Sequence, residues 1–219
     1  MFADRSEAGR RLARALARYA DARPVVLALP RGGVPVAYEV AEALDAPLDI
    51  VLVRKLGAPG HEELGVGAVV DGAEPQTVWN EDVLRAVGAT KDALEATRRR
   101  ELEEIERRRG VYRAGRGPEP VRGRTVIVVD DGIATGATAG AALKALARVA
   151  PAELVLAVPV APPETVATLE AEADALVCLE TPAAFMAIGA HYRDFSQTSD
   201  EEVAALLRKA EGFGARAAD

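Results

Sequence analysis

The sequence predicts an α/β protein in which a parallel central sheet is flanked by helices on both faces. Short apolar runs of strand length alternate along the chain with stretches whose apolar residues recur at a helical period. Such alternation is typical of strand–helix–strand units, which build parallel sheets. With 219 residues and 49% hydrophobic content the chain can bury a large core, so we expect a single domain over residues 1–219.

The first part of the chain is predicted to contain two helices and three strands. Residues 5–20 carry apolar side chains at helical spacing, and residues 34–44 form a second helical stretch after a Gly-containing turn. Short runs of branched apolar residues predict strands over 24–29, 48–53 and 64–70. Residues 57–63 are rich in Gly and Pro, so they are predicted to be a loop between the last two strands.

Residues 81–109 form a strongly charged helical insertion. Glu and Arg residues stand four positions apart in this stretch, at the right spacing for ion pairs along a helix, as in Glu95 and Arg99, Glu103 and Arg107, and Glu104 and Arg108. The apolar stripe of the insertion is thin, so we expect it to project from the core. A solvated helix and a homodimer contact are both compatible with this pattern.

The second part of the chain repeats the alternation of strands and helices. A buried strand is predicted over 125–131, and the helix that follows begins near Gly136. Two further strands, over 153–161 and 174–180, flank a helix over 164–172. A last helix is predicted from about Asp200, with Ser199 as its amino-terminal cap.

The composition excludes several classes of protein. The balance of 27 basic against 34 acidic residues gives a net charge of -7, which argues against nucleic-acid and anionic-membrane partners. Cys178 is the only cysteine, so an internal disulfide is excluded and a reducing cytoplasmic location is expected. The apolar runs are of strand length, which predicts no membrane span.

The motif with the clearest chemistry is VIVVDDGIATGAT, residues 126–138. A buried strand delivers Asp130 and Asp131, a turn of small residues follows, and a helix begins. In a parallel sheet, ligands bind beyond the carboxyl ends of the strands, where the free N–H groups and the positive dipole of the next helix attract phosphate. The paired carboxylates are acceptors suited to a vicinal diol. A ribose that carries a phosphate satisfies both halves of the motif.

Individual residues of this loop have distinct uses. Gly136 and Ala137 allow the backbone to close around phosphate oxygens, and Thr135 and Thr138 can add hydroxyl donors. The sequence contains neither a Walker loop nor a GxGxxG dinucleotide fingerprint. A generic strand–turn–helix junction with an acidic strand end is the alternative.

A second candidate anion site follows the first strand, in the segment LPRGGVP at 29–35. Arg31, Gly32 and Gly33 come directly after the strand and at the start of a helix, where backbone amides and a cation can meet an anion. Arg54 and Lys55 are predicted to end the second strand and to add two cations at the same edge. A tight turn with a solvated arginine and a solvated strand end are the competing interpretations.

The motif at 126–138 resembles that of the type I phosphoribosyltransferases, in which apolar residues, two acids and two variable positions precede a small residue and T-G-x-T. The resemblance covers about residues 24–160. It implies that Asp130 and Asp131 contact the ribose 2'- and 3'-hydroxyls and that the loop from Ala134 to Thr138 holds the 5'-phosphate. Gly132 departs from the family pattern, because a larger apolar residue is common there.

The resemblance also implies that the loop after the first core strand binds pyrophosphate and contains a cis or strained peptide, which is expected between Pro30 and Arg31. Gly32 stands where some relatives carry a lysine, so Arg31 and the backbone would bear more of the anion binding. Arg54 and Lys55 would face the pyrophosphate. Residues 57–63 resemble the mobile loop that closes over the substrate in this family, and His61 within it is given no catalytic role.

The activity implied is transfer of the 5-phosphoribosyl group from phosphoribosyl pyrophosphate (PRPP) to a nitrogen of a nucleobase-like acceptor, within nucleotide metabolism. Mg²⁺ would be held with PRPP by Asp130 and Asp131. Ala134 stands where the 6-oxopurine branch carries a further aspartate, which counts against hypoxanthine-guanine salvage. The resemblance leaves two other possibilities, a non-catalytic PRPP-binding regulatory protein and an accessory protein like those linked to DNA uptake.

Acceptor choice in this family depends on a hood over the sheet. The hood is predicted from residues 1–20 and 181–219, around a core of about 21–180. The hood segment at 181–219 includes side chains that could stack on a flat base, namely Phe185, Met186, Tyr192 and Phe195. Docking of the carboxyl-terminal segment onto the core is an equally good account of them.

Overall fold

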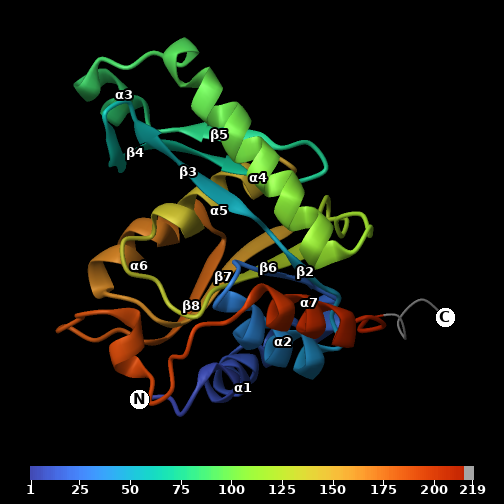
Figure 1. The fold of residues 1–219 in the computed structure, drawn as a ribbon. Coiled ribbons are helices and arrows are strands. Elements are labelled where there is room, and N and C mark those ends of the chain that lie inside the picture. Colours follow the sequence, from blue (N-terminus) through green and yellow to red (C-terminus); the bar gives the residue numbers. More distant parts are fainter. Residues whose placement is uncertain (215–219) are drawn as a thin grey trace.

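A five-stranded parallel sheet lies at the centre of the protein, whose computed structural model describes residues 1–214 (Figure 1). Each neighbouring pair of strands is parallel. In spatial order the strands are β2 (Leu48–Ile50), β1 (Val25–Ala28), β6 (Thr125–Val129), β7 (Glu153–Val160) and β8 (Ala175–Glu180). The predicted fold class, a parallel sheet flanked by helices, is therefore confirmed.

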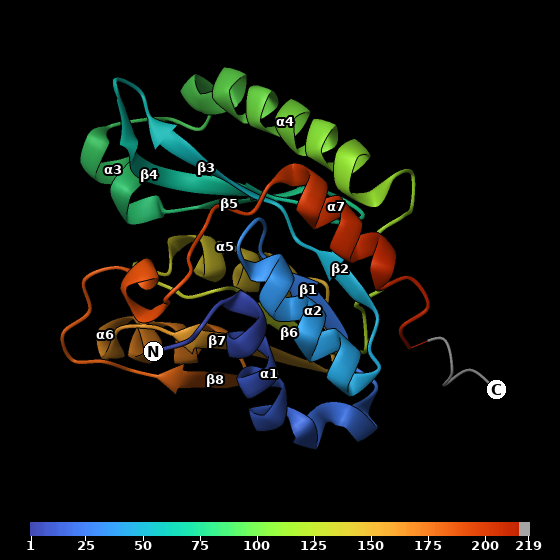
Figure 2. The same ribbon diagram turned by 60° about the horizontal axis from the view of Figure 1, so that its bottom comes forward.

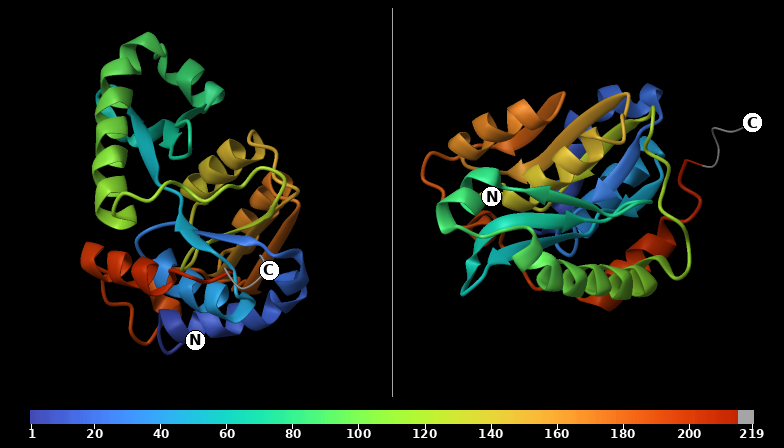
Figure 3. Two further views of the ribbon diagram at one scale, coloured as in Figure 1. Left: turned by 90° about the vertical axis from the view of Figure 1, so that its right-hand side faces the viewer. Right: turned by 90° about the horizontal axis from the view of Figure 1, so that it is seen from above.

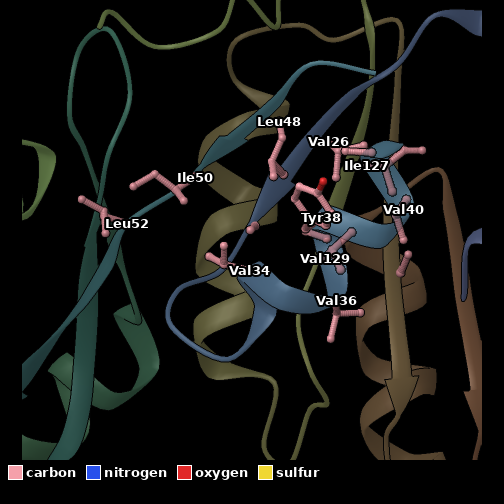
Figure 4. Packing of buried hydrophobic residues seen from close by; sticks show 14 of the residues in the cluster. Val26, Val34, Val36, Tyr38, Val40, Leu48, Ile50, Leu52, Ile127 and Val129 are labelled. Atoms are coloured by element: carbon pink, nitrogen blue, oxygen red, sulfur yellow. The ribbon is translucent and has the colours of Figure 1, made fainter. Parts of the chain in front are cut away.

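Helices cover both faces of this sheet because the inward side chains of its strands are apolar on both sides. One face carries α1 (Arg5–Ala15), α2 (Gly33–Leu44) and α7 (Asp200–Lys209), while the other carries α5 (Ala137–Ala147) and α6 (Pro163–Leu169). Val26 and Ile127 pack in the first layer with Tyr38 and Val40 of α2 (Figure 4). Their strand neighbour Val126 belongs to the cluster under α5, as alternation along a strand requires.

The predicted strand over 48–53 is wrong in one respect, because the chain leaves the central sheet after Ile50. Residues from Val53 onward form a separate antiparallel sheet of β3 (Val53–Ala58), β4 (His61–Val70) and β5 (Gln76–Trp79). The predicted strand over 64–70 is thus part of β4 and not a third strand of the central sheet. Periodicity locates an apolar strand but does not show which sheet it joins.

The predicted loop over 57–63 is also wrong. Ala58 pairs with His61 across a tight turn, so most of the segment belongs to the β3–β4 hairpin. Gly60 in this turn has φ of 76°, a left-handed conformation that glycine adopts without steric cost. The Gly and Pro residues that indicated a loop are those of a hairpin turn.

The charged insertion does not project freely, contrary to the prediction. It consists of α3 (Glu81–Val87), a short 3₁₀ helix (Asp92–Leu94) and α4 (Glu95–Arg113), and it covers the small sheet (Figure 2). Leu94, Ile105 and Tyr112 are at most 1% exposed, against β3, β4 and α7. A few large side chains on one face are enough to pack this helix against the small sheet, although its overall composition is strongly polar.

The small sheet is stacked between two helices. Its contacts with α5 lie on one side and those with α4 on the other, so the layers are central sheet, α5, small sheet and α4 (Figure 3). Helix α7 packs against both α4 and α2 and joins the outer layer to the inner one. The predicted cap of α7 is confirmed, because Ser199 and Glu202 form a reciprocal capping box.

The amino-terminal end of the chain pairs with the segment that follows β8. The backbone of Phe2 is hydrogen-bonded to His191 and Arg193 at 2.8 and 2.9 Å, next to a short 3₁₀ helix (Ile188–His191). Residues 181–199 then run to the start of α7. The last five residues of the predicted hood, 215–219, lie outside the described residues.

A buried charge network ties the end of α4 to both sheets. Arg113 lies 2.8 Å from Asp49 of β2 and 2.9 Å from Asp71, which follows β4. Arg109 lies 2.7 Å from Asp71, whose side chain is only 1% exposed. Burial raises the pKa of Asp71, and the charges of Arg113 and Arg109 oppose that rise. Arg113 therefore compensates two carboxylates that would otherwise be buried without a full counter-charge.

We expect Arg113→Ala to lower the free energy of unfolding by about 3–5 kcal/mol, because it leaves Asp49 and Asp71 without their shared cation. Arg107→Ala on the same helix is the matched control. Its side chain is 57% exposed and pairs with Glu104 on the surface of the helix, so a loss below about 1 kcal/mol is expected. Urea unfolding of both variants measures the difference, and equal losses would contradict a structural role for the network.

The buried hydroxyl of Tyr112 should make the folded protein less stable at alkaline pH. Its hydroxyl donates a hydrogen bond to Asp200, and burial, followed by that bond, raises the pKa of Tyr112 to about 12. In the unfolded chain a tyrosine has a pKa of about 10. Because the folded protein holds the Tyr112 proton more tightly, Tyr112 contributes stability that is fully present below about pH 10. This contribution is lost as the pH rises from about 10 toward about 12.

Between about pH 9 and about pH 11, wild-type protein should lose about 1.4 kcal/mol more stability than Tyr112→Phe, which cannot ionise. Chemical denaturation at the two pH values measures this slope. Parallel slopes for the two proteins would show that Tyr112 does not set the alkaline limit.

Candidate functional site

The two predicted anion loops lie side by side at the carboxyl edge of the central sheet. Strands β1 and β6 are neighbours, and Leu29 N–H continues their pairing with a bond to the Val129 carbonyl at 2.9 Å. The approach is so close that a Cβ on Gly33 would lie 2.8 Å from that carbonyl oxygen. Glycine is thus required where the two loops cross. The sequence predicted both loops, and the strand order brings them together.

The loop from Ala134 to Thr138 is open to solvent at the amino end of α5. Gly136 caps this helix with φ of 77°, and no side chain caps it. Ala134, Thr135, Ala137 and Thr138 are exposed. The loop is fixed from below, because Thr165 donates a hydrogen bond of 2.7 Å to the Ala134 carbonyl. Uncapped amides and two accessible hydroxyls are the groups that an anion site requires.

Asp130 and Asp131 lie at the mouth of β6, next to this loop. Asp130 Oδ1 accepts the Asp131 amide at 2.9 Å, and Asp131 Oδ2 accepts Arg5 Nε at 2.7 Å. These two contacts use one oxygen of each carboxylate and do not involve Asp130 Oδ2 or Asp131 Oδ1. Each aspartate therefore keeps one acceptor for a ligand.

The two carboxylates differ in their electrostatic surroundings. Burial, and then the neighbouring charge of Asp131, raise the pKa of Asp130 well above its usual range. Burial also raises the pKa of Asp131, but the hydrogen bond from Arg5 opposes this. A bound cation or a donor hydroxyl at the pair would relieve the repulsion between them.

Arg5 is a site residue that sequence reasoning missed. It is the first residue of α1, its side chain is 12% exposed, and it lies far from the motif in sequence. Besides Asp131, it donates to the Ser196 carbonyl at 2.7 Å, and its guanidinium lies 4.0 Å from the Phe195 ring centre. Its signal in the sequence is weak, because an arginine in the first turn of an amphipathic helix is normally solvated.

The loop after β1 has the predicted cis peptide, between Pro30 and Arg31. Arg31 is 37% exposed and its Nη1 lies 3.8 Å from Asp200 at the start of α7. A Cβ on Gly32 would lie 2.0 Å from Asp131 Oδ2, so this loop closes directly onto the second carboxylate of the motif.

Arg54 and Lys55 do not end a strand of the central sheet, as the sequence predicted, but lie within β3. Adjacent residues of a strand face opposite sides. Arg54 lies on the α4 side and pairs with Glu101 at 2.7 Å. Lys55 shares the other side with Val53, which packs in the cluster that includes α5. The two cations therefore cannot face one pyrophosphate together.

The predicted stacking residues of the hood occupy different environments. Tyr192 is buried against Phe2 and donates a hydrogen bond to the Asp131 carbonyl, so it serves docking. The Phe195 ring packs against the guanidinium of Arg5, and Phe185 stacks on His191 with ring centres 5.5 Å apart. Met186 is 90% exposed. Tyr192 thus contacts the motif directly, at the Asp131 carbonyl, and Phe195 contacts it through Arg5.

Gly132 is explained by the same segment. A Cβ at this position would lie 2.6 Å from a methyl group of Ile188 and 3.0 Å from Val160. The space that a larger apolar residue fills in the family pattern is taken here by Ile188. The hood and the motif loop are thus in direct contact next to Asp131.

Comparison with known proteins agrees with this geometry. The sequence profile of the phosphoribosyl transferase domain matches residues 4–193. The chain belongs to this family. It is 49% identical over 210 residues to two Mycobacterium tuberculosis proteins named as phosphoribosyl transferases, from strains CDC 1551 and H37Rv. That alignment covers 96% of the chain but 47% of each relative, so the chain spans about half the length of the curated relatives it matches.

Among solved structures, the protein TT1426 of Thermus thermophilus has the same fold as this phosphoribosyl transferase domain. The TM-score is 0.84 and the sequence identity is 46%, over 95% of this chain and 98% of that one. In the part of the chain that the structure describes, no helix has both the length and the apolar character needed to cross a bilayer.

Gly136 provides a test of the phosphate loop. Gly136→Ala places a Cβ on a left-handed residue, 3.0 Å from Thr165 and 3.1 Å from Leu169, and should lower the free energy of unfolding by about 1–2 kcal/mol. Gly140→Ala in the same helix is the control, because its Cβ meets only Leu169, at 3.4 Å. We expect Gly140→Ala to be neutral or stabilising by up to about 1 kcal/mol in thermal unfolding. Equal behaviour of the two variants would contradict the strained conformation of Gly136.

Proposed function

We propose that this protein transfers the 5-phosphoribosyl group from PRPP to a nitrogen of a nucleobase-like acceptor and releases pyrophosphate. The observation that carries the proposal is the junction of β6 and α5, where two carboxylates and an uncapped helix amino end share one loop. Free carboxylate oxygens suit the two ribose hydroxyls, and the amides with the Thr135 and Thr138 hydroxyls suit the 5'-phosphate. Ribose 5-phosphate carries both groups on one sugar.

The pyrophosphate would lie over the loop after β1. Gly32 and Gly33 leave room for an anion close to the backbone, and the long 3.8 Å contact of Arg31 with Asp200 would allow its side chain to turn toward that anion. Lys55, on the α5 side of β3, is a further candidate cation. Arg54 receives no role, because it faces α4 and pairs with Glu101. Positive charge at the leaving group stabilises the transition state as the bond to C1 breaks.

Phosphoribosyltransferases generally use Mg²⁺ together with PRPP. No group of three or more His, Cys, Asp or Glu within residues 1–214 is placed to hold a metal ion. Asp130 and Asp131 nevertheless fit Mg²⁺, which is usually bound by one or two carboxylates and by substrate phosphates. When bound, the ion would supply positive charge to the pyrophosphate oxygens. The residues themselves orient the sugar through its hydroxyls.

The reaction requires little proton transfer by the protein. The acceptor nitrogen forms a bond to C1 of the ribose while the bond from C1 to the pyrophosphate oxygen breaks. Positive charge develops on the sugar in between, and the negative potential of Asp130 and Asp131 favours it. Positioning of the sugar and of the acceptor accounts for the rest of the catalysis.

A non-catalytic PRPP-binding regulatory protein is the second candidate. It is favoured by the contacts of Arg31 with Asp200 and of Arg54 with Glu101, which occupy two of the predicted cations. The two candidates differ in whether a base triggers release of pyrophosphate.

Incubation with PRPP, Mg²⁺ and a panel of purine, pyrimidine and pyridine bases, followed by mass spectrometry, tests the proposal. We expect release of pyrophosphate that depends on one class of base. Asp131→Asn should weaken PRPP binding at least about tenfold and abolish this release, because it removes the charge that orients the diol. Binding of PRPP without turnover of any base would support the regulatory protein.

Asp92→Asn is the matched control, since Asp92 is an exposed acid of the insertion. It should bind PRPP as the wild type does. Absence of PRPP binding by the wild type in the presence of Mg²⁺ would overturn both candidate functions.

A further inference from the structure

We propose that Arg5 is a pyrophosphate-binding residue, supplied by helix α1 in place of the basic side chain that position 32 lacks. This inference rests on the proposed function and adds to it a residue from outside the two predicted loops. The starting observation is the place of Arg5 between those loops. Its Nε is 2.7 Å from Asp131 and 3.2 Å from the position that a Cβ on Gly32 would occupy.

The space at position 32 explains why a side chain there is replaced by one from elsewhere. A Cβ on Gly32 would lie 2.0 Å from Asp131 Oδ2 and 2.6 Å from its carboxyl carbon. No residue other than glycine fits without moving that carboxylate. A cation at this point of the loop can therefore come only from another element, and Arg5 is in contact with the same carboxylate oxygen.

Arg5 is held in place by contacts that leave part of its guanidinium unused. The Nε donates to Asp131, the Nη1 donates to the Ser196 carbonyl at 2.7 Å, and the Phe195 ring lies beneath the group at 4.0 Å. The Nη2 donates to no atom within residues 1–214. A guanidinium that is fixed on three sides loses little conformational freedom when it binds an oxyanion.

The position also suits the leaving group electrostatically. Arg5 partly neutralises Asp131, which would otherwise repel a pyrophosphate bound over Gly32 and Gly33. Its remaining N–H groups can bind a pyrophosphate oxygen, and such charge-assisted hydrogen bonds are among the stronger ones in proteins. Arg5 would thus link the diol carboxylate to the leaving group through one rigid side chain.

Calorimetric titration of the full chain with PRPP, inorganic pyrophosphate and ribose 5-phosphate, each with Mg²⁺, tests this role. We expect Arg5→Gln to weaken binding of PRPP and of pyrophosphate by about 10- to 100-fold, while ribose 5-phosphate changes by less than about threefold. Arg5→Lys keeps the charge but not the planar group of donors, so it should recover only part of the pyrophosphate affinity, about 3- to 10-fold relative to Arg5→Gln. Arg10→Gln, on the same helix and paired with Glu39 at 3.2 Å, is the control and should bind as the wild type does.

Unchanged or tighter pyrophosphate binding by Arg5→Gln would overturn the proposal, as would equal affinities of the Gln and Lys variants. If Arg5→Gln does not fold, Phe195→Leu takes its place, because it removes the ring that fixes Arg5 but keeps the charge. We then expect pyrophosphate affinity to fall by about 3- to 10-fold, and an unchanged affinity would overturn the role. Failure of the wild type to bind any of the three ligands would instead count against the proposed function.

Discussion

The parallel pairing of β1 with β6 is the constraint on which the site depends. It places the loop after β1 and the loop after β6 side by side, and each loop begins a helix whose amino end faces the same edge of the sheet. Contact between them is close enough that Gly32 and Gly33 admit no side chain. One pair of strands therefore brings together the two loops that we propose bind anions, with the carboxylates of Asp130 and Asp131 between them.

The hood completes this site by filling space that two glycines leave. Ile188 lies where a side chain at Gly132 would extend, and Arg5 lies beside the missing side chain of Gly32. At both positions the core has a glycine where the family pattern has a larger residue. A side chain from the hood occupies the space that the larger residue would fill. Core and hood are therefore complementary at the atoms next to Asp131, so under the proposed function the hood would contribute to the PRPP site as well as cover the acceptor.

The outer layers are organised around charge as much as around apolar contact. Helix α4 has few apolar residues, and it is fixed at one end by Arg113 with Asp49 and Asp71 and near its middle by Glu101 with Arg54. Buried pairs of this kind bring little net stability compared with an apolar core, but removal of one partner is costly. They specify where the helix lies against the small sheet, whose other side packs on α5.

The sequence by itself determined the fold class, the strand–loop–helix units and the loop from Asp130 to Thr138. These features are encoded locally, in apolar periodicity and in a contiguous motif. Only the tertiary structure decided that residues 53–79 form a second sheet, because a strand shows its own periodicity and not its partner. It also separated Arg54 from Lys55 and brought Arg5 to Asp131, since contacts between residues far apart in the chain depend on how whole elements pack.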